Sequence, residues 1–65
     1  MENITINAQE RTVEAEGIRI VGWDSTLGFH TDFNTVKKIQ EGNYRKSTLE
    51  YLERLYYLVF IKETV

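Results

Sequence analysis

The chain of 65 residues contains no cysteine and no proline. Without cysteine it can form neither a disulfide nor a zinc site built on thiolates. A domain of this size buries only about 60% of the surface that its unfolded chain exposes, so it usually needs a disulfide, a metal or a partner chain for stability. Because disulfides are excluded, we expect a partner, most simply a second copy in a homo-oligomer. The absence of cysteine also fits a reducing cytoplasm.

Long apolar runs are also missing. The longest, Tyr56–Ile61, is far too short to cross a bilayer. The first residues are polar and acidic, which is not typical of a signal peptide. The sequence therefore predicts a soluble, cytoplasmic protein with no membrane partner.

The residues of common catalytic and metal sites are scarce. His30 is the single histidine, and it would form a triad with Ser25 and Asp24 only by an accident of the fold. The spacing of Asp24, His30 and Asp32 matches no established metal site. The four glycines are dispersed and form no phosphate-binding loop. We predict a protein that is not an enzyme and that uses no cofactor or metal.

The net charge of −2 conceals an uneven distribution. Residues 1–33 hold two cations and six carboxylates, whereas residues 34–65 hold six cations and four carboxylates. Four of those six cations fall between Lys37 and Lys46. A local patch, not the total charge, sets the field that a phosphate experiences. This stretch is therefore a candidate nucleic-acid-binding patch, with an ordinary solvated face as the alternative.

Residues 1–31 predict a β-rich part. β-branched residues alternate with polar ones, which is the period of a half-buried strand. Thr12–Glu16 and Ile18–Trp23 could pair as a hairpin around Gly17. A helix over Ala8–Glu16 is the competing interpretation, although its apolar residues are too few for a buried face. Leu27–Phe29 indicates either another short strand or one helical turn.

Residues 32–42 predict a short amphipathic helix. Asp32 is a suitable N-cap, and Gly42 suits the left-handed position just beyond a helix end. The apolar side chains between them recur at helical spacing, and the two lysines lie largely elsewhere. This helix carries half of the basic patch.

A second helix is expected over residues 47–62. Ser47 and Glu50 have the spacing of a capping box. Apolar residues then cover more than one face, so the helix end is buried on all sides, binds another chain, or leaves the helix as a strand over Tyr57–Lys62. We favour self-association or another protein partner. The candidate interface residues are Tyr51, Tyr57, Leu58, Phe60 and Ile61.

The helix pair carries a recognisable pattern. Thr35–Gly42, TVKKIQEG, resembles the recognition helix of the lambda-repressor/Cro-type helix-turn-helix family, whose pattern there is T-I/V-x-x-I/L-x-x-G. Ser47–Leu55, STLEYLERL, is similar to the family's next helix, and Asn43–Lys46, NYRK, is similar to its basic turn. The resemblance covers Asp32–Tyr57. The family has a second helix with a glutamine near its start and an alanine facing the recognition helix, and Ile18–Phe29, IRIVGWDSTLGF, shows neither.

The resemblance implies double-stranded DNA as the partner. Residues 32–42 would enter the major groove, with Val36 and Ile39 in the core. The base contacts would come from Phe33, Asn34 and Lys38. The phosphate contacts would come from Thr35, Lys37, Asn43, Tyr44, Arg45 and Lys46.

We therefore predict one α+β domain over residues 1–65, with a β-hairpin or short meander followed by two helices in a helix-turn-helix-like arrangement. An all-α five-helix domain is the alternative. The first functional hypothesis is a small DNA-binding regulator, a repressor or a recombination accessory factor of phage or mobile-element character. The second is a protein-binding module, such as a small inhibitor or an assembly subunit, with no affinity for DNA.

Overall fold

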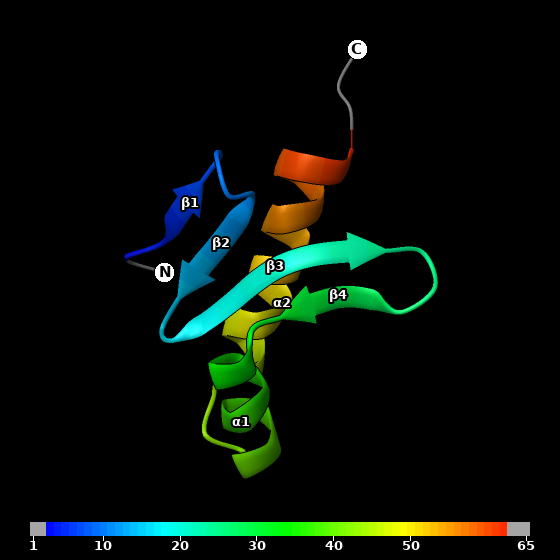
Figure 1. Ribbon diagram of the computed structural model, residues 1–65. Coiled ribbons are helices and arrows are strands. Elements are labelled where there is room, and N and C mark those ends of the chain that lie inside the picture. Colours follow the sequence, from blue (N-terminus) through cyan, green and yellow to red (C-terminus); the bar gives the residue numbers. More distant parts are fainter. Residues whose placement is uncertain (1–2, 63–65) are drawn as a thin grey trace.

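The structure, a computed structural model, describes residues 3–62. Four antiparallel strands follow one another as a meander in the order β1-β2-β3-β4, and two helices come after them. Helix α2 runs along one face of the sheet, and α1 lies at one end of α2, away from the C-terminus (Figure 1). The bounds are β1 Thr5–Asn7, β2 Thr12–Ala15, β3 Ile18–Asp24, β4 Gly28–Thr31, α1 Phe33–Glu41, α2 Lys46–Tyr56 and a final π-helical turn, η1, Tyr57–Ile61.

The α+β prediction is confirmed. Residues 13–15 pair with residues 18–20, so the predicted hairpin around Gly17 forms and the alternative helix over Ala8–Glu16 is wrong. The segment after Leu27 is strand β4 and not a helical turn. The all-α alternative is wrong because four strands occupy Thr5–Thr31. Residues 1 and 2 of the predicted β-rich part lie outside the described range.

The β2–β3 hairpin supplies most of the core. Val13 lies opposite Ile20 and Ala15 opposite Ile18, and all four side chains are buried. Cross-strand partners point to the same face of a sheet, so the alternation in the sequence places these four residues together. The residues between them, Glu14 among them, face away from the core and stay partly exposed.

A bulge in β3 changes which residues face the helix. Ile20 pairs with Thr31 and Gly22 with His30, so the register shifts at Val21. An extra residue in one strand reverses the inward and outward alternation beyond it. Consequently Trp23 packs against the core and against Tyr57, with ring centroids 5.8 Å apart.

Helix α2 closes the core. Leu52 and Tyr56, four residues apart, lie on one face of the helix and are buried against the sheet. The Tyr56 ring meets Phe29 of β4 edge to face, at a centroid distance of 6.4 Å. Full burial of a side chain such as Leu52 contributes about 1.5–3 kcal/mol. The helix therefore ties β2, β3 and β4 into one core.

The helix begins one residue earlier than predicted, and its N-cap lies two positions before the predicted Ser47. Arg45 is the N-cap and Lys46 the first helical residue, so Ser47 caps nothing. The backbone N–H groups of Thr48 and Leu49 both donate to the Arg45 carbonyl. The Thr48 hydroxyl donates to Glu16 on the β2–β3 turn at 2.8 Å. This tertiary bond fixes where the helix meets the sheet, and it overrides the local capping box.

The predicted helix over 47–62 continues to Ile61 but changes its winding. Tyr57–Ile61 forms a π-helical turn, in which the Lys62 N–H donates to the Tyr57 carbonyl at 2.8 Å. No strand forms over Tyr57–Ile61. The Phe60 ring packs on Tyr56 and lies 5.0 Å below the guanidinium of Arg11, which also donates to the Phe60 carbonyl. The β1–β2 turn thus holds the end of the helix.

Helix α1 is attached through one buried side chain, Thr35. The helix begins and ends as predicted: the Asp32 carboxylate accepts from the Thr35 N–H, and Gly42 is left-handed at φ 72°. The Thr35 hydroxyl accepts from the backbone N–H of Arg19 at 2.9 Å. Arg19 lies just beyond the last pairing of β3 with β4. The Thr35 hydroxyl therefore supplies the hydrogen-bond acceptor that β4 no longer provides at this position. Val36, predicted to be core, is instead at the surface.

This bond leads to a first prediction. Thr35→Val keeps the volume of the side chain but leaves the Arg19 N–H without its acceptor, so it should lower the free energy of unfolding by about 1–3 kcal/mol. Thr35→Ser, which keeps the hydroxyl, should retain most of that bond and serves as the control. Urea unfolding followed by Trp23 fluorescence measures both. Equal stability of Thr35→Val and the wild type would remove the proposed role of this hydroxyl.

Candidate nucleic-acid interface

Helix α1 presents its outer side to solvent. Thr35 faces the sheet, and Phe33 and Lys37 lie two residues away on either side of it, which places both on roughly the opposite side of the helix. Phe33 is 75% exposed. The Lys37 ammonium lies 5.7 Å from the centroid of the Phe33 ring. A helix face with one aromatic ring and one cation is thus open to a partner.

Four cations, Lys37, Lys38, Arg45 and Lys46, lie on α1, in the α1–α2 link and at the first residue of α2, at the end of the molecule away from the C-terminus (Figure 1). We call this region the basic end. The aliphatic stem of Lys38 lies over Gly17 of the turn. Arg45 lies 3.8 Å from a carboxylate oxygen of Glu16, while the other oxygen of that carboxylate accepts from Thr48. Among residues 3–62, Lys37, Lys38 and Lys46 form no ion pair.

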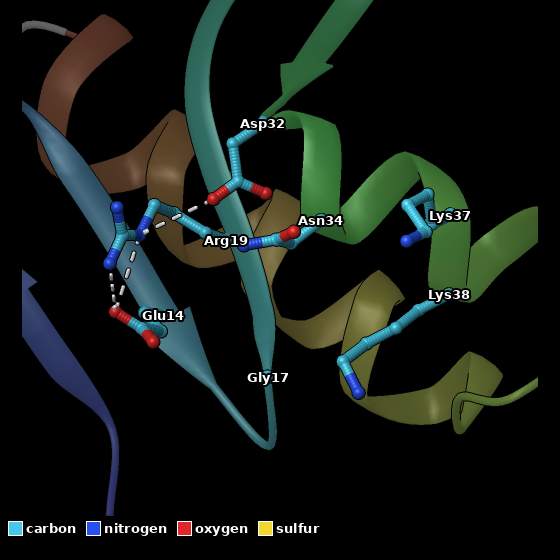
Figure 2. A pocket seen from close by; sticks show the side chains of 7 residues that line it. All are labelled: Glu14, Gly17, Arg19, Asp32, Asn34, Lys37 and Lys38. Atoms are coloured by element: carbon cyan, nitrogen blue, oxygen red, sulfur yellow. Dashed lines mark hydrogen bonds and ion pairs between the residues drawn. The ribbon is translucent and has the colours of Figure 1, made fainter.

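A solvent-open pocket of about 420 Å³ separates α1 from the β2–β3 hairpin. Figure 2 shows two walls, with Glu14, Arg19 and Asp32 in contact on one side and the two lysines on the α1 side. The Asn34 side chain lies between the walls (Figure 2). The lining residues are Glu14, Gly17, Arg19, Asp32, Asn34, Lys37 and Lys38.

The hairpin wall is held by Arg19. Its guanidinium donates to Glu14 at 3.0 Å and lies 3.9 Å from the second oxygen of the Asp32 carboxylate. The hydrogen bond and the charge of Glu14 raise the pKa of Arg19 above its ordinary value. Hydrogen bonding from Thr35, supported by the charge of Arg19, lowers the pKa of Asp32. The guanidinium of Arg19 thus partly offsets the negative charge of both carboxylates on this side of the pocket.

Asp32 gives the second prediction, a pH dependence of stability. A carboxyl whose folded pKa is depressed contributes stability above its unfolded pKa, and loses it as the pH falls through the folded value. The stability advantage of the wild type over Asp32→Asn should therefore shrink below about pH 4, the region of the unfolded Asp pKa. Urea unfolding over a pH series measures this difference. A constant difference down to about pH 2 would contradict the assignment.

The structure separates the residues predicted to contact DNA. Thr35, predicted to contact phosphate, is wholly buried and bonded to Arg19, so that prediction is wrong. Tyr44 packs partly against the core and is half-buried. Asn34 and Lys38 line the pocket. The remaining predicted contacts are exposed: Phe33, Lys37, Asn43, Arg45 and Lys46.

The residues predicted to form a protein interface also divide into two groups. Tyr51, Tyr57 and Leu58 are exposed on the outside of the C-terminal helix. Phe60 and Ile61 are half-buried and pack against the core, because the π-helical turn brings them back toward the sheet. Val59, which was not predicted, is exposed beside Leu58.

The pocket itself was not foreseen. The hairpin contributes Glu14, Gly17 and Arg19 to its lining. The one signal of this in the sequence was Gly17 as a turn residue, and in the structure its φ is 79°. At the other end of β3, His30 Nε2 contacts Asp24, whose carboxylate also accepts from two N–H groups of the β3–β4 turn. Asp24 is thereby engaged as a turn-capping residue. The described residues contain no group of three side chains suited to hold a metal ion.

Within residues 3–62, no helix has the length and apolar character needed to cross a membrane. The fold defines the class of protein as a small antiparallel meander covered on one face by its C-terminal helix. Comparison of the chain with protein-family models, curated proteins and solved structures finds no significant match.

Proposed function

We propose that this protein is a non-catalytic DNA-binding protein that docks on duplex DNA through its basic end. The observation that carries the proposal is the position of the four cations beside an α1 that buries only Thr35. Cations clustered on one end attract a polyanion even when the whole chain is slightly acidic. Such a protein would act as a repressor or as an accessory factor in recombination.

The nearby carboxylates support this proposal because they are already engaged. Glu14 accepts from Arg19, Asp32 from the Thr35 N–H, and Glu16 from Thr48. Their negative charge is therefore partly offset within the protein. Glu41 is exposed at the end of α1 and opposes the attraction. The three lysines of the basic end remain to meet phosphates.

The dimensions of α1 suit a groove. An α-helix with its side chains is about 10–12 Å across, and the major groove of B-DNA is about 12 Å wide and admits such a helix. Phe33 lies on the outer face, so a thymine methyl is its natural partner, and Lys37 beside it would reach a phosphate. Asn43, Arg45 and Lys46 follow in the link and would contact the backbone, which positions the helix without reading sequence.

Fluorescence anisotropy with a labelled duplex of about 20 base pairs tests the proposal. Titrations between about 50 and 200 mM salt should give an association constant that falls with salt, with a logarithmic slope of about −0.9 for each phosphate contact. Three or four contacts are expected from the basic end, so the slope should be about −3. No binding at the lowest salt, with protein at about 100 μM, would overturn the proposal.

A second candidate function, binding to another protein chain, rests on a separate observation. Tyr51 and Leu58, seven residues apart along α2 and η1, are exposed, and Leu58 is 50% exposed with the exposed Val59 beside it. Exposed apolar side chains that adjoin one another mark interaction surfaces. A second copy of the chain is the occupant that we favour, since a domain this small gains stability from a dimer.

Analytical ultracentrifugation tests this second candidate. The wild type should sediment as a dimer at about 100 μM, and Leu58→Asp as a monomer, because a charge cannot enter an apolar interface without a partner. Leu27→Asp, at the exposed tip of the β3–β4 turn, is the matched control and should leave the dimer intact. A monomeric wild type would remove the homodimer.

A further inference from the structure

Lys38 holds a defined position at the rim of the pocket. A Cβ added to Gly17 would lie 2.7 Å from Lys38 Cε and 3.3 Å from Lys38 Nζ. The stem of the lysine therefore rests directly on the backbone of the β2–β3 turn, and the side chain is half-buried. A long cationic side chain that lies against a wall loses less freedom when it binds a ligand than one that extends into solvent.

The two walls of the pocket differ in charge. On one side, Glu14 of the hairpin and Asp32, the N-cap of α1, both face Arg19. On the α1 wall, Lys37 and Lys38 have no carboxylate partner among the described residues. The lining thus carries three cations and two carboxylates, and its unbalanced charge is positive and lies along α1.

The donors on the α1 wall point to one kind of ligand. Lysine ammonium groups have three N–H donors and no acceptor, and the Asn34 amide adds two more donors. A group with several acceptor oxygens and a negative charge can bond to both lysines and to the amide together. A phosphate group has this form, and the pocket volume of about 420 Å³ leaves room for it.

We infer that the pocket between α1 and the β2–β3 turn is a seat for a phosphate group, held by Lys38 and Lys37 with the Asn34 amide. The inference rests on the proposed function, in which the ligand is a phosphodiester of the DNA backbone. It moves Lys38 from reading a base, as the sequence suggested, to holding a phosphate beside the groove. The outer face of α1, with Phe33, then remains for the bases.

The test compares two single lysine variants in the duplex anisotropy assay. Lys38→Met keeps the aliphatic stem over Gly17 but removes the charge, whereas Lys62→Met removes an exposed lysine at the other end of the molecule. Loss of one phosphate contact should lower the magnitude of the salt slope by about 0.9, with roughly fivefold weaker binding, for Lys38→Met alone. Lys38→Arg, which retains the charge, should restore the slope.

Two outcomes distinguish a failure of the pocket inference from a failure of the proposed function. If the wild type binds DNA and Lys38→Met behaves like Lys62→Met, the pocket inference is overturned while DNA binding stands. If the wild type does not bind DNA, the proposed function fails, and inorganic phosphate becomes the probe. Its titration is followed by ¹H–¹⁵N NMR at the Asn34 side-chain amide and the Gly17 amide, against chloride at equal ionic strength.

The phosphate titration decides the inference in that case. Saturable shifts of these two amides that are absent in Lys38→Met would support a seat for free phosphate. Shifts absent from the wild type, or equal in chloride, would overturn it. The far-UV circular dichroism spectra of both lysine variants should match the wild type, since neither side chain belongs to the buried core.

Discussion

Replacement of Leu52 by alanine is expected to destabilise the fold more than any other change considered for this chain. Leu52 is completely buried and is part of the cluster formed with Val13, Ile18 and Ile20. Truncation of a buried leucine costs about 2–5 kcal/mol, because the loss of apolar burial is joined by a cavity. A domain of this size has about 3–5 kcal/mol in all. The variant should therefore be largely unfolded at physiological temperature.

Thermal unfolding followed by circular dichroism measures the effect of Leu52→Ala. For a domain of this length, each kcal/mol shifts the midpoint by about 4–8 °C. Leu27→Ala is the control, since Leu27 is 76% exposed at the tip of the β3–β4 turn and lies outside both the core and the proposed dimer surface. The control should unfold within a few degrees of the wild type. A similar loss in both variants would show that α2 is not held to the sheet through Leu52.

The second large effect concerns binding. Lys37→Gln combined with Lys38→Gln should weaken duplex binding by about tenfold or more and lower the magnitude of the salt slope by about 1.8, because two phosphate contacts are lost. Lys37 lies near the Phe33 ring and Lys38 over Gly17, and both line the pocket, so the double variant removes both cations of α1 from the basic end.

The matched control for this pair is Arg54→Gln combined with Lys62→Gln. It removes the same total charge from the C-terminal helix. If position decides binding, the control should retain the wild-type slope. An equal loss in both double variants would mean that the overall charge of the protein governs binding and that the basic end has no special part in it. Affinity and slope are measured by anisotropy over the same salt series.

The strands could be predicted because their signal is local. Val13 with Ala15 and Ile18 with Ile20 alternate with polar residues, and Gly17 separates the two runs. A period of two leaves only one face to bury, so the pairing across the turn follows directly. The caps of α1 were predictable for the same reason, since Asp32 and Gly42 act on backbone groups within four residues of themselves.

The features that were missed depend on residues distant in the chain. Thr35 resembles any threonine in the first turn of a helix, and only the end of β4 gives it the Arg19 N–H as a partner. Ser47 has the pattern of a cap, but the bond between Thr48 and Glu16 sets the start of α2 instead. Local patterns do not contain these tertiary bonds, and so the sequence could not reveal them.

The candidate site was predictable in composition but not in geometry. The cluster of cations from Lys37 to Lys46 is visible in the sequence. The pocket is not, because Gly17 and Lys38 meet only after the chain has crossed from β4 into α1. This contact also decides which residues of α1 line the pocket, such as Asn34, and which lie on the outer face, such as Phe33.

The order of the strands has a consequence for how the protein reaches its native state. Each strand pairs with its neighbour in the chain, so the hairpins can form early through short loops. The apolar face of the sheet nevertheless remains exposed to solvent until Leu52 and Tyr56 of α2 pack against it. During synthesis the meander therefore stays uncovered until residues 46–61 have left the ribosome. A pause before that point would leave an exposed apolar sheet that is prone to aggregate.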